Sequence, residues 1–217
     1  MYVTYDDFND NSFDTSKWTH TKLPGVELYE RNQRLEFVWT GEVSGFVGDR
    51  VISAKVFAFN VGKEYEIGVT VVVCGDSAGL VAVVDSYNYY GISISSRGEL
   101  SVVCVINGSL YPLKSIIVGK TSGKLAIGVT NSEVYFKFDG NEVYRETYRL
   151  PSRSVNIVLL CTVSDTNTLA AFDDAYFATT EIPAVTQLIQ MFTNLMPLFM
   201  IMMMLVMFTS FIRTLKE

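Results

Sequence analysis

Residues suited to holding a sugar gather in one short segment of the chain. Carbohydrate recognition needs an aromatic platform flanked by amides and acids, and the segment DSYNYY supplies all three. Because side chains alternate along a strand, at least one of its tyrosines is expected to point into the core. A further aromatic candidate lies earlier, in EFVWTGE. The candidate glycan-binding residues are Trp39, Asp85, Tyr87, Asn88, Tyr89 and Tyr90.

Carboxylates spaced for catalysis are scarce. Glycoside hydrolysis commonly uses two acids that flank the bond to be cut. Glu64 and Glu66 share one strand face in KEYEIGV, but an apolar run follows them. Asp85 stands alone, and Asp173 and Asp174 fall on opposite faces of their strand. Motifs for a serine nucleophile or a phosphate-binding loop do not occur in the sequence.

Composition excludes two further classes of site. The net charge is −6 over 217 residues, and Lys and Arg are spread singly, which argues against a nucleic-acid partner. Cys74, Cys104 and Cys161 each lie in an apolar, β-branched run and are predicted to be buried free thiols, although one pair could meet in the fold. His20 is the only histidine and is predicted to lie on the surface; zinc-ligand spacing is absent from the sequence.

Residues 1–180 read as short strands joined by turns. EVYFKFD alternates, with Val134, Phe136 and Phe138 on one face. Turn signals recur about every 8–12 residues. DG in FKFDGNEVY and NG in VINGSLY predict tight hairpins. The pattern predicts an all-β fold, a two-sheet antiparallel jelly-roll sandwich, over 1–180.

Four segments carry a family resemblance over roughly residues 5–178. DDFNDNSFDTSKWT, SAGLVAVVDSYNYYGISISSRGELSV, GKLAIGVTNSEVYFKFDGNEV and AAFDDAYF resemble, in order, strands of the concanavalin A-like lectin/glucanase superfamily, in particular its laminin-G-like members. The resemblance implies a structural calcium, for which Asp7 and Asp174 are the candidate ligands, with no other cofactor. The alternative is an acidic turn closed by Asx-type hydrogen bonds. Glucanases of this superfamily carry Glu-x-Asp-x-(x)-Glu on one strand, and that motif is missing, so catalysis is not expected.

The C-terminal segment predicts a membrane anchor. No charged residue occurs in 182–212, and LMPLFMIMMMLVMF is apolar on every helical face. A linker over 181–185, one transmembrane helix over 186–213 and a tail over 214–217 are expected. The predicted anchor residues are Leu195, Pro197, Phe199, Met203, Leu205, Phe208 and Phe211.

Two features of this helix leave alternatives open. Gln187, Gln190 and Asn194 share one helical face and predict either a helix–helix contact or an interfacial polar stripe. Arg213 and Lys216 favour a cytoplasmic C-terminus, whereas the absence of a signal peptide favours a β-domain on the cytosolic side. The side of the membrane stays open.

These observations support a non-enzymatic function. The first hypothesis is a membrane-anchored structural protein, a virion or envelope coat or spike subunit, in a virion membrane or at a cell surface. Its partners would be the lipid bilayer, copies of itself or other coat subunits. The alternative is an anchored glycan-binding module for adhesion or receptor recognition. A degenerate glycoside hydrolase is a distant third, because the strands show no acid pair of the required pattern.

Overall fold

The computed structural model describes residues 2–20, 24–41, 47–164 and 169–181. The chain divides into two compact units, Met1–Thr180 and Glu181–Glu217. Within the described ranges, no helix has the length and hydropathy needed to span a bilayer. The predicted transmembrane helix over 186–213, with its anchor and helix-contact residues, lies outside the described residues.

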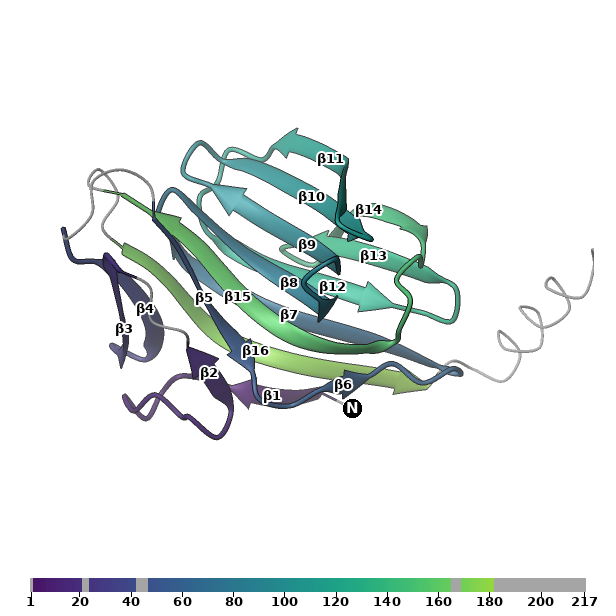
Figure 1. The fold of residues 1–217 in the computed structure, drawn as a ribbon, viewed down its shortest axis with the longest axis horizontal. Helices are drawn as coiled ribbons and strands as arrows, with labels where there is room; N and C mark the ends of the chain where they lie inside the picture. The colour runs from purple at the N-terminus through teal and green to yellow at the C-terminus, as the bar shows by residue number, and fades with distance from the viewer. Residues whose placement is uncertain (1, 21–23, 42–46, 165–168, 182–217) are drawn as a thin grey trace, which may run out of the picture. The chain divides into compact units, whose positions relative to one another are not determined.

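The first unit is a sandwich of two antiparallel sheets, as predicted (Figure 1). Sheet A runs in the order β14 (Asn141–Thr147), β13 (Glu133–Phe138), β12 (Gly123–Val129), β7 (Lys63–Cys74), β16 (Leu169–Glu181), β4 (Arg34–Trp39) and β3 (Val26–Arg31), with β1 (Tyr2–Asp6) also paired to β16. Sheet B runs in the order β11 (Ser109–Ile117), β10 (Glu99–Ile106), β9 (Asn88–Ser95), β8 (Ser77–Asp85), β15 (Ser154–Val163), β5 (Val47–Ser53) and β2 (Trp18–His20), with β6 (Phe57–Ala58) also paired to β15.

The core lies between the sheets and is built from the predicted alternation. In β13, Val134, Phe136 and Phe138 are buried in the core, while Lys137 lies on the opposite face. Each fully buried side chain of this size contributes roughly 1.5–3 kcal/mol. The three cysteines are free and buried, as expected from their apolar surroundings.

Two hairpins form where the sequence predicts them. Asp139 and Gly140 have φ values of 48° and 79°, and Asn107 and Gly108 have 50° and 78°. Positive φ at both central residues is the requirement of a type I′ turn, which Asn-Gly and Asp-Gly meet at low cost. These turns fix the β13–β14 and β10–β11 registers, and thereby which side chains face outwards on each sheet.

Candidate functional site

The outer face of sheet B is organised in rows that cross its strands. The strand registers align three rows, which we name by composition. The tyrosine row is Leu110, Val105, Tyr89, Val83 and Asn156. The valine row is Pro112, Val103, Gly91, Val81, Val158 and Ile52. The serine row is Ser115, Ser101, Ser93, Gly79, Leu160 and Arg50.

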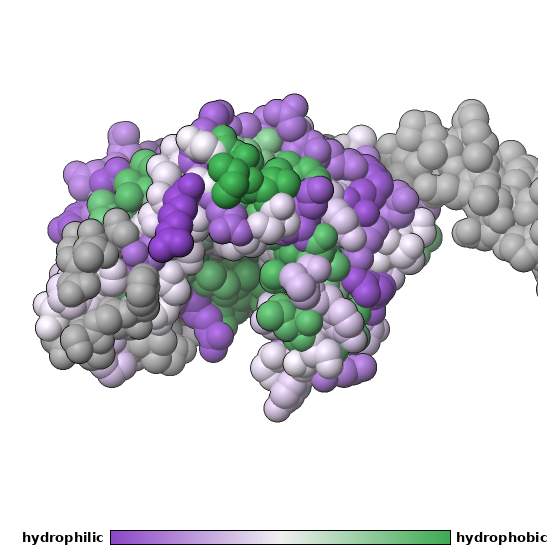
Figure 2. All heavy atoms as spheres, turned by 90° about the horizontal axis from the view of Figure 1, so that it is seen from above, coloured by the Kyte–Doolittle hydropathy of each residue, from purple (hydrophilic) through white to green (hydrophobic). Residues whose placement is uncertain are grey.

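A groove of about 480 Å³ lies on this face, over β8, β15 and β5. Valine, isoleucine and leucine side chains form its floor, and a few polar groups lie among them. Figure 2 shows the molecule hollowed on one side, with apolar residues exposed at the bottom of the hollow. The lining residues are Arg50, Ile52, Val81, Val83, Val84, Asp85, Ser86, Tyr89, Asn156, Val158 and Leu160. A concave apolar surface with a small number of polar groups is the usual form of a ligand site.

Asp85 is held in place at one end of the groove. Its Oδ1 accepts hydrogen bonds from the backbone N–H of Tyr87 at 2.7 Å and from Asn88 Nδ2 at 3.0 Å. Asn88 Nδ2 also lies 3.1 Å from Asp85 Oδ2, and Asn88 Oδ1 accepts from the Asn107 backbone N–H at 3.0 Å. The buried Asn88 amide therefore ties the β8–β9 turn to the β10–β11 turn and orients an exposed carboxylate.

The structure separates the other predicted sugar-binding residues. Tyr89 lines the groove beside Asp85. Tyr87 is 64% exposed at the adjoining turn. Tyr90 points into the core, where its hydroxyl accepts a hydrogen bond from the Arg149 backbone N–H at 2.9 Å. Trp39 lies on β4 in sheet A and packs against the core, away from the groove lining.

Sequence reasoning missed the far wall of the groove. Arg50 and Asn156 lie on β5 and β15, and they reach the groove only because β15 pairs with both β5 and β8. Nothing in the local pattern around either residue indicates that pairing. The alternation in RVIS and SVNIVLL gives the outward positions of each strand, but it does not say which strands are neighbours.

Glu64 and Glu66 share the outer face of sheet A, as predicted, in a small cavity of about 300 Å³ that Tyr135 and Lys137 also line. Glu66 accepts from Lys137 Nζ at 2.7 Å and from the Tyr176 hydroxyl at 2.7 Å. Burial acts to raise the pKa of Glu66, but these hydrogen bonds outweigh burial and lower it. A carboxylate engaged in this way stabilises the sheet rather than offering a free acid.

Two tyrosines cover this face of sheet A because glycines lie beneath them. A Cβ atom at Gly128 would lie 1.8 Å from the Tyr135 ring, and one at Gly68 would lie 2.2 Å from the Tyr176 ring. Both rings therefore lie flat on the sheet, and both hydroxyls reach Glu66. The carboxylate pair predicted from KEYEIGV is thus partly built into the scaffold.

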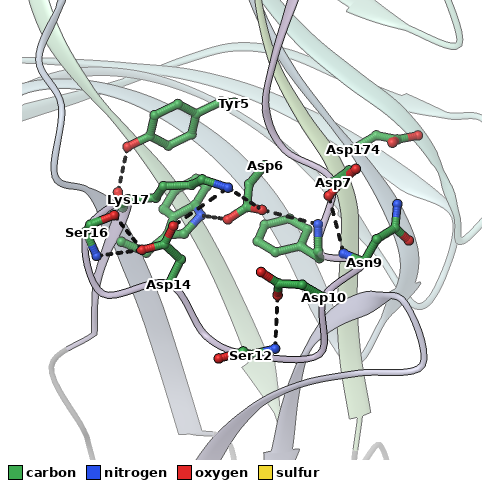
Figure 3. A network of polar contacts seen from close by, with 12 residues as sticks. Tyr5, Asp6, Asp7, Asn9, Asp10, Ser12, Asp14, Ser16, Lys17 and Asp174 are labelled. Carbon is green, nitrogen blue, oxygen red and sulfur yellow. Dashed lines mark hydrogen bonds and ion pairs between the residues drawn. The ribbon is translucent and has the colours of Figure 1, made fainter.

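The acidic N-terminal segment forms a network of short-range hydrogen bonds (Figure 3). Asp6 accepts from Trp18 Nε1 at 2.7 Å and from Lys17 Nζ at 3.2 Å. Asp10 and Asp14 accept from backbone N–H groups two residues on, at 3.0 and 2.8 Å, which is the Asx-type alternative.

The two candidate calcium ligands, Asp7 and Asp174, lie at the edge of this network (Figure 3). Asp7 and Asp174 supply two carboxylates, whereas calcium takes six to eight oxygen ligands. Among the described residues, no group of three or more His, Cys, Asp or Glu side chains is placed to hold a metal ion. The Lys17 ammonium group lies 3.2 Å from Asp6 and 3.8 Å from Asp14, so a cation from the chain itself pairs with these two acids.

His20 differs from the expectation of a surface residue. It lies in β2 and is 14% exposed, and its Nε2 is 2.8 Å from Oδ2 of the fully buried Asp49. Pairing of β2 with β5 brings the two residues together although 29 positions separate them. The contact joins two strands of sheet B on the side away from the groove.

Comparison with known proteins identifies the fold. No family model matches the sequence, and no curated protein matches it. A Bacillus licheniformis β-glucanase superposes with a TM-score of 0.61 at 11% identity, covering 82% of this chain and 96% of that chain. A structure from work on endo-acting O-glycanases, which members of the human gut microbiota express to initiate mucin breakdown, superposes with a TM-score of 0.61 at 13% sequence identity. The match covers 84% of this chain and 98% of that chain. The carbohydrate-binding module CBM66 from Bacillus subtilis superposes with a TM-score of 0.51 at 13% sequence identity, covering 74% of this chain and 94% of that chain.

These likenesses confirm a concanavalin A-like jelly-roll sandwich. They also contradict the expectation of a non-enzymatic coat or spike subunit, because these neighbours include glucanases, endo-acting O-glycanases and a glycosyl hydrolase family protein. The missing Glu-x-Asp-x-(x)-Glu motif had suggested that no enzyme was present. One motif defines one arrangement of acids on this fold, and its absence does not exclude others.

Proposed function

We propose that this protein acts on glycans, and that the groove on the outer face of sheet B is where an oligosaccharide binds and is cleaved. The observation that carries the proposal is the groove itself. The Tyr89 ring, the exposed Asp85 carboxylate, the Asn156 amide and the Arg50 guanidinium surround one apolar floor. Two glucanases of known structure share the fold.

The lining matches the two kinds of surface that a sugar ring presents. The apolar floor of Val81, Val83 and Val158 suits the C–H faces of the rings, and the Tyr89 ring adds a surface for stacking. Asp85 and Asn156 offer hydrogen-bond partners for hydroxyl groups at the edges. Gly79 and Gly91 keep the adjoining floor low, because neither has a side chain to obstruct the approach of a ligand.

Asp85 is the one carboxylate among the described groove residues and is exposed, so we assign it the role of general base. Its Oδ1 is held by the Tyr87 backbone N–H and by Asn88, which fixes the direction of the carboxylate. In hydrolysis, Asp85 accepts a proton from a water molecule as that water attacks the anomeric carbon. The glycosidic C–O bond breaks, and the departing oxygen takes a proton from the solvent that fills the open groove.

The test separates binding from cleavage. The full-length protein is incubated with a panel of labelled oligosaccharides, and products are separated by chromatography. We expect cleavage by the native chain and a loss of at least about a hundredfold in Asp85→Asn, with binding retained. Glu64→Gln is the matched control, because it removes one carboxylate on the other sheet. Cleavage that survives in Asp85→Asn but fails in Glu64→Gln would place the chemistry on sheet A instead.

We also propose that the segment 186–213 holds this domain at a membrane. Its support is the sequence: an apolar stretch long enough to cross the hydrocarbon core, without charged residues up to Ile212. An anchored glycan-active domain would work on glycans close to the bilayer surface.

A further inference from the structure

Arg50 is the cation of the groove, and its strand aims it outwards. Side chains alternate along β5, so Arg50 and Asp49 point to opposite faces of sheet B. Asp49 is buried against His20 and also accepts the Arg50 backbone N–H at 2.7 Å. Arg50 is exposed and lines the groove beside Leu160 and Ile52. The inner carboxylate therefore belongs to the core, and the guanidinium faces the ligand.

Arg50 and Asp85 lie at opposite ends of the groove. Arg50 pairs with Leu160, whereas the strand leading to Asp85 pairs through Val83 with Asn156. Four residues along β15 separate these positions, which is roughly 13 Å at about 3.3 Å per residue. That separation exceeds the screening length of about 8 Å at physiological ionic strength. Asp85 thus leaves the charge of Arg50 available to a ligand.

The surroundings of Arg50 suit an anionic substituent. In the serine row, Leu160 lies beside Arg50 and Gly79 follows it, so an apolar side chain and a position without a side chain adjoin the guanidinium. Arg50 and Asp85 are the charged side chains among the described groove residues, and no carboxylate belongs to the serine row. A guanidinium presents a planar set of donors that matches two oxygens of a carboxylate or sulfate group.

We propose that the groove selects acidic glycans, and that Arg50 recognises a carboxylate or sulfate on the sugar chain while Tyr89 and Asp85 hold the chain at the other end. This inference rests on the proposed function, since it assigns a substrate class to the same groove. The two anionic groups share one recognition chemistry, and the ligands of the test distinguish them.

The experiment measures binding of matched pairs of oligosaccharides to the full-length protein by calorimetry. One pair is an oligogalacturonate and its methyl ester, and the other is a sulfated oligosaccharide and its desulfated form. We expect at least one acidic member to bind about tenfold or more tightly than its neutral partner, because a charge-assisted bidentate contact is lost in the neutral form.

Variants assign the preference to Arg50. Arg50→Gln should reduce the preference to within about twofold, and Arg50→Lys should retain part of it. Arg97→Gln is the matched control, because it removes the same charge from the β9–β10 turn outside the groove lining. An unchanged preference in Arg50→Gln would overturn the inference. Equal binding of both members of each pair, or binding of neutral sugars alone, would overturn it and leave the proposed function standing. Binding of no glycan at all would overturn both.

Discussion

Glu30 gives the sharpest test of the physical account of the sandwich. It lies on β3 under the acidic N-terminal segment and is 7% exposed. Both of its carboxylate oxygens are buried without a hydrogen-bond partner among the described residues. Burial, together with the nearby Asp10, raises the pKa of Glu30 from 4.5 to about 7. Between pH 4.5 and about 7, Glu30 is therefore mostly protonated in the folded protein and mostly ionised in the unfolded chain.

The sign of the effect follows from linkage. A raised pKa in the folded state adds stability that is fully present below pH 4.5 and is lost as the pH rises through about 7. The size of the loss is about 3 kcal/mol, at about 1.36 kcal/mol for each tenfold change in proton affinity. Glu30→Gln mimics the protonated carboxyl in size, shape and charge. The variant should match the native chain near pH 4.5 and exceed it by up to about 3 kcal/mol at pH 8.

The assay is urea unfolding from pH 4.5 to pH 8, followed by the fluorescence of Trp18 and Trp39, which both pack in or against the core. Subtracting the native curve from the variant curve cancels the titration of the groups that do not interact with Glu30. Glu27→Gln is the matched control, because it removes the same charge from a partly exposed position on the same strand. A difference between Glu30→Gln and the native chain that stays constant across this range would refute the reasoning.

Three further predictions concern the groove tyrosines, the glycine beneath Tyr135 on sheet A, and the C-terminal segment. Tyr89→Ala should weaken glycan binding at least about fivefold and leave the domain folded. Tyr90→Ala removes a ring from the core and should lower the free energy of unfolding by about 3–5 kcal/mol. Equal destabilisation by the two substitutions would place Tyr89 in the core. Gly128→Ala should lower the free energy of unfolding by about 1–3 kcal/mol, because the added methyl group lifts the Tyr135 ring off the sheet. In a chain that also carries Tyr135→Ala the clash is gone, so Gly128→Ala should then cost less. If the two substitutions have additive costs in thermal unfolding, Tyr135 does not pack on Gly128. A chain ending at residue 180 should be soluble and β-rich by circular dichroism, while the full chain should need detergent; a full chain that stays monodisperse in buffer would contradict the anchor.

Strand pattern and turn chemistry carried the fold prediction. The alternation of EVYFKFD and the DG and NG turns depend on neighbours along the chain, and Phe136 and Gly140 lie where those rules put them. The order of strands within each sheet was not predicted, because pairing across tens of residues leaves no local mark in the sequence. The assignment of Tyr90 to the core illustrates the limit: alternation required one buried tyrosine and could not say which.

For the same reason, the sequence predicted only part of the candidate site. Asp85 and Tyr89 belong to one hairpin and were found together. Arg50 and Asn156 reach the groove through β15 pairings that join positions far apart in sequence. His20 shows the converse case. Its neighbours suggested an exposed loop, whereas pairing of β2 with β5 places it against the buried Asp49.

The most direct test of the central claim is to locate a bound oligosaccharide on the protein. Backbone amide shifts of the isotope-labelled full-length chain in detergent are recorded during titration with the tightest ligand of the panel. The account predicts that the largest changes fall on the groove of sheet B, at Val81, Tyr89 and Asn156. Changes centred on the outer face of sheet A, around Glu66 and Tyr135, would contradict it.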